Sequence, residues 1–174
     1  MYQIMEFFMK KLALSMLAFL FLLFFCGCGS SPPEMKLHIY ASYSAEYEGI
    51  KLQGLLIYSE TGEMYLDIST PDELSSLSFS WNEDFTMGYR GLNAMTEKGY
   101  LPDTSFGENI KNVFDDLRLK DYALNQGEND SYFAKCENSD GKYEVFTDRS
   151  GYITELRLED FTVKLNNQHK NARQ

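Results

Sequence analysis

The 174-residue sequence predicts a mainly β protein of the α+β class, in which a strongly curved antiparallel sheet, or half-barrel, carries one main helix on its concave face. Apolar residues alternate with period two in about ten successive runs, which is typical of half-buried strands. Turn residues such as Ser-Glu-Thr-Gly at 59–62 separate these runs. Only one segment shows helical spacing of its apolar residues. A closed barrel is the alternative arrangement of the same strands.

The N-terminal segment has the layout of a secretory signal. Lys10 and Lys11 precede an uncharged, mostly apolar stretch at 12–25, and small residues follow it. The stretch has 14 residues, whereas a membrane-spanning helix needs about 20, so a permanent span is the weaker interpretation. Glu6 is unusual in such a signal, and translation from Met9 would give an ordinary start.

Two cysteines close the apolar stretch, and one of them suits lipidation. The segment Phe25-Cys26-Gly27-Cys28 resembles the signal of bacterial lipoproteins, in which an apolar residue, a small residue and then Gly or Ala precede the lipidated cysteine. This resemblance implies that Cys28 is the lipidated residue, since Cys26 would follow the bulky Phe25. Cys-Gly-Cys also lacks the two-residue spacer of a thioredoxin-type pair, and no further ligands accompany it as zinc sites require.

These signals predict four segments: a lipoprotein signal peptide at 1–27, a lipidated tether at 28–35, a single β-rich domain at 36–166 and a flexible tail at 167–174. Cleavage before Cys28 would leave 147 residues, which suits one domain with a single core. The cleaved chain would hold 14 basic and 25 acidic residues, a net charge of −11. Phosphates and anionic headgroups repel such a chain. We therefore expect no nucleic-acid partner and membrane attachment through an N-terminal diacylglyceryl cysteine.

Period-two alternation predicts strands in the first half at 36–47, 49–59, 63–69, 77–81 and 85–89. The second strand has Leu52 and Leu56 on one face, with Leu55 and Ile57 on the other. It is therefore expected to be buried on both faces, or covered by something on one. Thr70 as an N-cap, with a proline after it, predicts one helical turn between the third and fourth strands.

The single substantial helix is predicted over 105–119. Ser105 and Glu108 have capping-box spacing at its start. One stripe of the helix collects its apolar residues, as expected where a helix docks on a sheet. The stripe consists of Ile110, Val113, Phe114 and Leu117.

A second set of strands is predicted at 121–126, 131–137, 142–148, 152–159 and 161–165. The inward positions of the last two strands differ in phase, which predicts a bulge or a sharp bend at Glu159 and Asp160. Cys136 lies on the apolar face of its strand. It is expected to be a small buried residue, because no basic partner lowers the pKa of its thiol.

No constellation of residues predicts catalysis, a metal site or a cofactor. His38 is the one realistic imidazole, and hydrolysis using it is a minor hypothesis because a triad needs two further positioned groups. The adjacent pair Asp115-Asp116 is interpreted as surface charge. Asn138, Asp140 and Gly141 match inner positions of a calcium loop, but its first and last ligands are absent. A hairpin turn is therefore expected there.

The order of elements resembles the lipoprotein-carrier superfamily of the LolA and LolB type, over roughly residues 36–165. The resemblance rests on early strands that end in YLDISTP at 65–71, on the middle helix, and on the closing YEVFTDRSGYITELRLEDFTVKL at 143–165. It implies an open half-barrel whose concave face binds acyl chains or hydrophobic peptide. In some members it implies a partner that holds or activates a cell-wall enzyme.

The leading hypothesis is therefore a non-catalytic, lipid-anchored envelope protein that holds an apolar ligand, an acyl chain or a lipoprotein, in its curved sheet. The alternative is an interaction or regulatory lipoprotein that binds or activates an envelope enzyme. The expected location is extracytoplasmic, on the cell membrane or on the outer membrane of a two-membrane host. The expected groove is formed by Leu56, Leu66, Phe79, Trp81 and Met87, with Ile110, Val113 and Phe114 as a lid.

Overall fold

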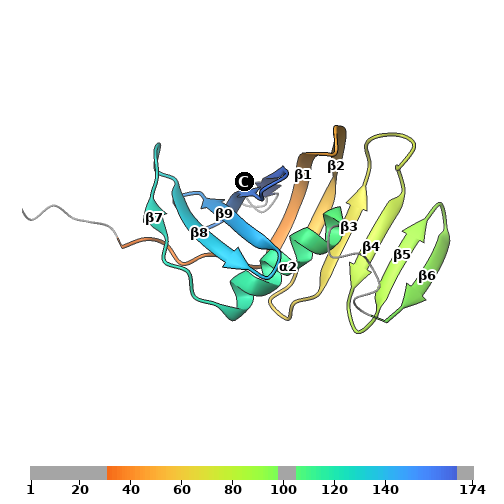
Figure 1. Cartoon of the computed structure of the whole chain (residues 1–174), viewed down its shortest axis with the longest axis horizontal. Coiled ribbons are helices and arrows are strands. Elements are labelled where there is room, and N and C mark those ends of the chain that lie inside the picture. Colours follow the sequence, from red (N-terminus) through yellow and green to blue (C-terminus); the bar gives the residue numbers. More distant parts are fainter. Residues whose placement is uncertain (1–30, 98–104, 168–174) are drawn as a thin grey trace, which may run out of the picture. The chain divides into compact units, whose positions relative to one another are not determined.

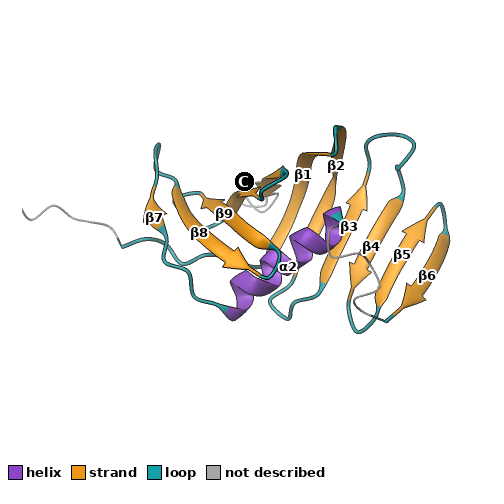
Figure 2. Ribbon diagram, viewed as in Figure 1, coloured by secondary structure: helices purple, strands orange, loops and turns teal. Residues whose placement is uncertain are grey.

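A computed structural model describes residues 31–97 and 105–167, and these form one curved antiparallel sheet with a helix against it (Figures 1 and 2). The predicted signal peptide, Cys28 and residues 168–174 of the predicted tail lie outside the described residues. The helix is α2 (Phe106–Leu119). The strands are β1 (Ile39–Tyr47), β2 (Ile50–Tyr58), β3 (Met64–Ile68), β4 (Leu77–Trp81), β5 (Phe85–Tyr89), β6 (Leu92–Thr96), β7 (Asn125–Gln126), β8 (Tyr132–Asn138), β9 (Gly141–Thr147), β10 (Ile153–Arg157) and β11 (Thr162–Asn167).

The sheet is open. Its eleven described strands run in the order β6-β5-β4-β3-β2-β1-β11-β10-β9-β8-β7, so β6 and β7 are its two edges. The prediction of an open curved sheet with one main helix is confirmed, and the closed-barrel alternative is wrong. Among residues 31–97 and 105–167, no helix combines the length and apolar character needed to cross a membrane.

The connectivity explains why the helix lies across the sheet. The strands β1 to β6 form one meander and β7 to β11 form a second, and the two meanders join where β1 pairs with β11. The helix follows β6 and precedes β7, so it links the two opposite edges. A chain that connects these edges has to cross one face of the sheet, and Figure 1 shows α2 lying over that face between β8 and β3.

The helix begins and docks as its sequence predicts. Ser105 is the N-cap, and its side chain accepts a hydrogen bond from the backbone N–H of Glu108. The predicted apolar stripe is buried against the inner face of the sheet, together with the helix residues Phe106 and Gly107. Phe106 packs among aromatic rings of β1 and of the last hairpin, with ring centroids 5.4–5.8 Å away.

A bulge bends the sheet between β2 and β3. Leu56 pairs with Leu66, whereas Gln53 bridges Thr70. Between these two pairs, the two residues 54–55 of β2 therefore lie opposite the three residues 67–69 on the β3 side. Gly54 lies at this bulge, where a Cβ atom would be 1.9 Å from the carbonyl oxygen of Asp67. Only glycine permits such an approach, and the bulge adds twist and curvature to the sheet.

Hydrogen bonds hold the bulge from both sides. The hydroxyl of Tyr43, which is opposite Gly54 on β1, donates to the Asp67 carbonyl oxygen at 2.9 Å. The backbone N–H of Leu55 donates to the Asp67 carboxylate at 2.8 Å. The side chains of Leu55 and Ile57 are half-buried on the outer face, so β2 is fully buried on its inner face alone.

Several sequence-based details differ from the structure. Residues 71–76 form successive turns, in which the backbone N–H groups of Leu74 and Ser75 donate to the carbonyl groups three residues earlier. The predicted helical turn is therefore present only as this short i→i+3 turn, and Ser76 ends it with a positive φ of 75°. The strand β6 was not predicted, and β7 has two residues where six were expected. The sharp bend predicted at Glu159 and Asp160 is present as the tip of a hairpin, in which the backbone N–H of Leu158 donates to the Phe161 carbonyl. The irregularity in this region lies earlier, between Ile153 and Glu155, where β10 pairs with β9.

Candidate functional site

The inner side of β4, β5 and β6 extends past the helix and forms an apolar surface, called here the β4–β6 face. The strand register aligns its side chains in three rows across the strands. The rows are Leu77, Tyr89 and Leu92; then Phe79, Met87 and Ala94; then Trp81, Phe85 and Thr96. The opposite side of the same strands carries mainly Ser78, Ser80, Thr86 and Asn93. The polar side is therefore the outer one, as expected for a sheet with one solvated face.

Exposure rises across this face with distance from the helix. Trp81 and Phe85 are each 3% exposed, whereas Met87 is 38% exposed and Leu92 is 76% exposed. The helix has 14 residues, which gives a length of about 21 Å, whereas ten strand spacings correspond to about 48 Å. One helix of this length cannot cover the whole sheet, and the β4–β6 face is a part that it leaves open.

Trp81 marks the boundary between the covered and the open parts. Its ring packs against Gly107 at the start of α2, where a Cβ atom would lie 2.7 Å from the ring. Its indole nitrogen Nε1 donates to the Glu108 carboxylate at 2.9 Å. Glu108 was expected to complete a capping box, and its carboxylate serves to orient this indole. Phe79 and Phe85 flank the Trp81 ring, with centroids 5.9 and 5.3 Å away.

Four of the eight residues predicted to bind a ligand form one continuous row. Leu56 pairs with Leu66, Leu66 with Phe79, and Phe79 with Met87. Leu56 and Leu66 are 0% exposed beneath the helix, Phe79 is half-buried and Met87 is exposed. The row therefore runs from the core to the open β4–β6 face and continues to Ala94 on β6.

The three predicted lid residues lie on the buried side of α2. Ile110, Val113 and Phe114 are 0–1% exposed and belong to the main apolar core. Phe114 packs on Tyr58 with ring centroids 5.0 Å apart. These side chains belong to the same buried core as Leu56 and Leu66, so the predicted groove is occupied by core packing at one end and open at the other.

Sequence reasoning missed Leu92 and Ala94, which extend the open face to the sheet edge. The sequence feature that could have identified them is the turn before them. Arg90 and Gly91, with φ of 48° and 82°, form a two-residue turn between β5 and β6. Alternation in Leu-Asn-Ala-Met-Thr follows that turn. The period-two rule would have identified β6 if Arg90-Gly91 had been taken as a hairpin turn.

Two neighbouring aspartates fasten the helix to opposite halves of the sheet, which corrects their interpretation as surface charge. The Asp115 carboxylate accepts a hydrogen bond from the Tyr58 hydroxyl of β2 at 2.9 Å. The Asp116 carboxylate accepts one from the Tyr143 hydroxyl of β9 at 2.6 Å. Adjacent residues point to different sides of a helix, so Asp115 can bind a strand of the first meander while Asp116 binds a strand of the second.

The surroundings of these aspartates shift several pKa values. Burial opposes ionisation of Asp116, but hydrogen bonds from Lys120, Tyr122 and Tyr143 outweigh it and hold its pKa below the usual value. Burial, reinforced by the hydrogen bond to Asp116, raises the pKa of Tyr143 well above its ordinary value. Burial and then the Asp115 charge raise the pKa of Tyr58 to about 12. Both tyrosines therefore remain protonated donors at neutral pH.

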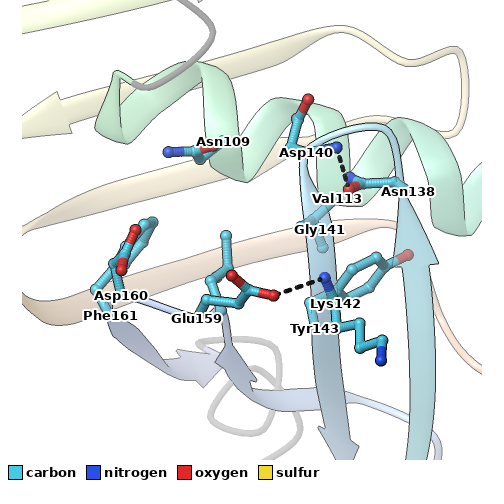
Figure 3. Close-up of a pocket in the computed structure, with 11 residues that line it drawn as sticks. Asn109, Val113, Asn138, Asp140, Gly141, Lys142, Tyr143, Glu159, Asp160 and Phe161 are labelled. Atoms are coloured by element: carbon cyan, nitrogen blue, oxygen red, sulfur yellow. Dashed lines mark hydrogen bonds between the residues drawn. The ribbon is translucent and has the colours of Figure 1, made fainter.

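A small hollow lies where the turn after β8 meets the helix and the last hairpin (Figure 3). The segment at 138–141 that resembles a calcium loop lines it, and this segment is the predicted hairpin turn, in which Asn138 accepts from the Asp140 backbone N–H at 2.9 Å. The Asp140 carboxylate accepts a hydrogen bond from Asn112 of the helix at 2.8 Å. Within the described residues, no group of three or more His, Cys, Asp or Glu side chains is placed to hold a metal ion.

A larger, open hollow of about 730 Å³ lies at the ends of β8, β9 and β10. Six of the ten residues that line it carry charged side chains. The charged residues are Lys135, Glu137, Lys142, Glu144, Arg157 and Glu159.

Cys136 and His38 have contrasting surroundings. Cys136 is 6% exposed in the core, and burial raises the pKa of its thiol to about 11. This agrees with the prediction of a small buried residue. His38 is exposed and lies just before β1, on the side of the chain opposite to the buried Ile39.

Comparison with known proteins gives one kind of match. No protein family and no curated protein matches the chain. Among solved structures, the fold is similar to that of a LolA superfamily protein from Nitrosomonas europaea, with 8% sequence identity and a TM-score of 0.35. The similar region covers 74% of this chain and 83% of that one.

Proposed function

We propose that this protein is a non-catalytic, lipid-anchored envelope protein that binds an acyl chain, free or as part of a lipoprotein, on its β4–β6 face. The observation that carries the proposal is the open end of the apolar row, where Phe79, Met87 and Ala94 lie beyond the helix. An acyl chain laid along this row gains about 0.8 kcal/mol for each methylene that it buries. The strand register already aligns the apolar side chains that the acyl chain would contact.

The ligand would contact the half-exposed part of the row, beside Trp81, and stop where the row reaches the buried Leu66. Phe79 and Met87 would form the floor, and the start of the helix would form the end wall. Trp81 is 3% exposed and packs directly on Phe79. Its fluorescence would therefore report binding of a ligand to Phe79, although the ligand would not displace the Trp81 ring. The helix residues Ile110 and Phe114 would remain in the core.

Titration with a saturated fatty acid tests this proposal, with Trp81 fluorescence and native mass spectrometry as readouts. Met87→Asp places a charge in the middle of the open row and should weaken binding at least about tenfold, equivalent to about 1.4 kcal/mol. Met95→Asp is the matched control, since Met95 is 70% exposed and lies on the outer side of β6. Equal loss in both variants, or no fatty acid bound to the unsubstituted protein, would refute binding at this face.

The membrane anchor is a separate part of the proposal. It rests on the lipoprotein-type signal that ends at Cys28, and it would place the domain outside the cell membrane. The mass of the mature N-terminus tests it, because lipidation adds acyl chains to Cys28. A Cys28→Ser protein that is processed normally and remains in the membrane would refute the anchor.

A second candidate function, binding of an envelope enzyme, is favoured by an apolar row on the outer face. Tyr40 pairs with Ile57, and Ile57 pairs with Tyr65. Tyr40 and Tyr65 are 37% and 36% exposed, and Leu55 lies beside them on β2. Co-purification from membranes with and without Ile57→Lys tests this candidate. An identical set of co-purified proteins in both preparations would count against it.

A further inference from the structure

The two edges of the sheet differ in how they are protected. The edge strand β7 has two residues, and on the strand behind it the Glu137 carbonyl accepts a hydrogen bond from Lys120 at 3.2 Å. The other edge strand, β6, has five residues and pairs with β5 on one side. Natural proteins usually protect such an edge with lysine, proline or a bulge. The five residues of β6 include no charge and no proline.

The hairpin geometry identifies which backbone groups of β6 point outward. A two-residue turn makes Tyr89 and Leu92 a hydrogen-bonded pair, and hydrogen-bonded pairs alternate along antiparallel strands. Ala94 therefore directs its N–H and C=O groups toward β5. Asn93 and Met95 direct theirs away from the sheet, where another strand could accept and donate.

We propose that this edge pairs with β6 of a second copy of the chain, antiparallel, with Ala94 of one copy opposite Ala94 of the other. In this register Asn93 of each copy exchanges backbone hydrogen bonds with Met95 of the other. The small Ala94 side chains meet on the two-fold axis, where bulkier residues would crowd. The pairing is a closed, isologous interface of the kind that is commonest in homodimers.

The charges at the ends of β6 fit an antiparallel second copy. Arg90 precedes the strand and Glu97 follows it, with no charged residue between them. Antiparallel pairing brings the Arg90 end of one strand to the Glu97 end of the other. A parallel arrangement would place like charges together.

The pairing also has a consequence for the β4–β6 face. The inner side of each β6 continues into the inner side of the other, so two open faces become one. From β4 of one copy to β4 of the other there are five strand spacings, or about 24 Å. The dimer does not require a ligand, but this joined surface is long enough for an extended acyl chain to lie across it.

The interface is small, so the dimer is expected to be weak. A five-residue edge is about 17 Å long, and its pairing buries less than the roughly 1,000 Å² of a typical stable interface. The net charge of −10 on each chain adds repulsion. Cross-linking is therefore the appropriate measurement, because it traps a short-lived pair in one register.

The test uses the full chain in its native membrane with Ala94→Cys, followed by mild oxidation. Two residues opposite each other in a non-hydrogen-bonded pair have Cα atoms about 4.5 Å apart, which a disulfide can bridge. The expected result is a disulfide-linked dimer, with the linked peptide identified by mass spectrometry. Leu92→Cys is the matched control: it is on the same face and 76% exposed, but lies four residues from register, more than about 10 Å from its counterpart.

Three outcomes would overturn the proposal. The first is equal dimer yield at both positions, which indicates random collision. The second is the absence of a dimer in the Ala94→Cys variant when its Trp81 fluorescence matches that of the unsubstituted protein, which shows that the variant is folded. The third is a cross-link to a different protein. Adding Met95→Pro removes an outward N–H without touching the β5 ladder, so it should abolish the cross-link. A cross-link that survives this change would contradict strand pairing.

Discussion

Replacing Gly54 by alanine is expected to destabilise the fold strongly, because the β2 backbone approaches the β3 side very closely at this glycine. The new Cβ atom would lie 1.9 Å from the Asp67 carbonyl oxygen, whereas ordinary contact begins near 3.4 Å. The β3 side of the bulge would have to move by about 1.5 Å, which overpacking data value at about 1–3 kcal/mol. The same movement would break the hydrogen bonds that Asp67 accepts from Tyr43 and Leu55, at about 1–1.5 kcal/mol each.

The combined loss is therefore about 3–6 kcal/mol, out of a typical total of about 5–15 kcal/mol. Urea unfolding monitored by Trp81 fluorescence measures the free energy of unfolding, and the thermal midpoint should fall by roughly 10 °C or more. Tyr43→Phe separates the contribution of one hydrogen bond and should cost about 1 kcal/mol.

Gly49→Ala is the matched control for this substitution. Its Cβ atom would meet nothing within 4 Å, and its only penalty comes from a φ of +79°, worth about 1–2 kcal/mol. If Gly54→Ala costs no more than Gly49→Ala, the close approach of β2 and β3 does not exist in solution, and the account of sheet curvature fails with it.

Three further predictions concern the helix and the core. Asp116→Asn should lower stability at pH 7 by about 1.5–3 kcal/mol. Because the folded pKa of Asp116 is depressed, its contribution is present above the unfolded value of about 3.9 and is lost as pH falls through the folded value. Acid titration of the urea midpoint should therefore show a shallower loss in Asp116→Asn than in the unsubstituted protein, and parallel curves would contradict this. Ser105→Ala should cost about 1 kcal/mol through loss of the N-cap, measured in the same way, and no change would mean that the cap is dispensable. Cys136, whose pKa is raised to about 11, should resist alkylation at pH 8 until the protein unfolds, as read by mass spectrometry of its peptide; fast labelling of the native protein would show that its strand opens readily.

Local physics explains how much of the fold is readable in the sequence. Alternation and turn residues identify most strands, because period two and turn chemistry are properties of a few consecutive residues. The Ser105 cap and the stripe that contains Ile110 and Phe114 likewise identify the helix. The strand β6 was not predicted because it has five residues, two of them small and polar, and so shows only weak alternation. The length of β7 was not predicted because a strand of two residues shows almost no alternation.

The candidate site was less accessible to this reasoning. Leu56, Leu66, Phe79 and Met87 were assigned to one inner face, and the register aligns them in one row. Their exposure differs from 0% to 38%, and nothing in the local pattern distinguishes a core leucine from an open methionine.

The sequence alone therefore determined the helix, most of the strands and the side of each predicted strand that turns inward, because these depend on neighbours along the chain. Tertiary structure decided which part of that inner face stays open. The helix is too short to cover the sheet, and Asp115 and Asp116 hold it to β2 and β9. Its start consequently reaches Trp81 and goes no further. Contacts between residues 27 to 57 positions apart set that boundary, and no short stretch of sequence contains them.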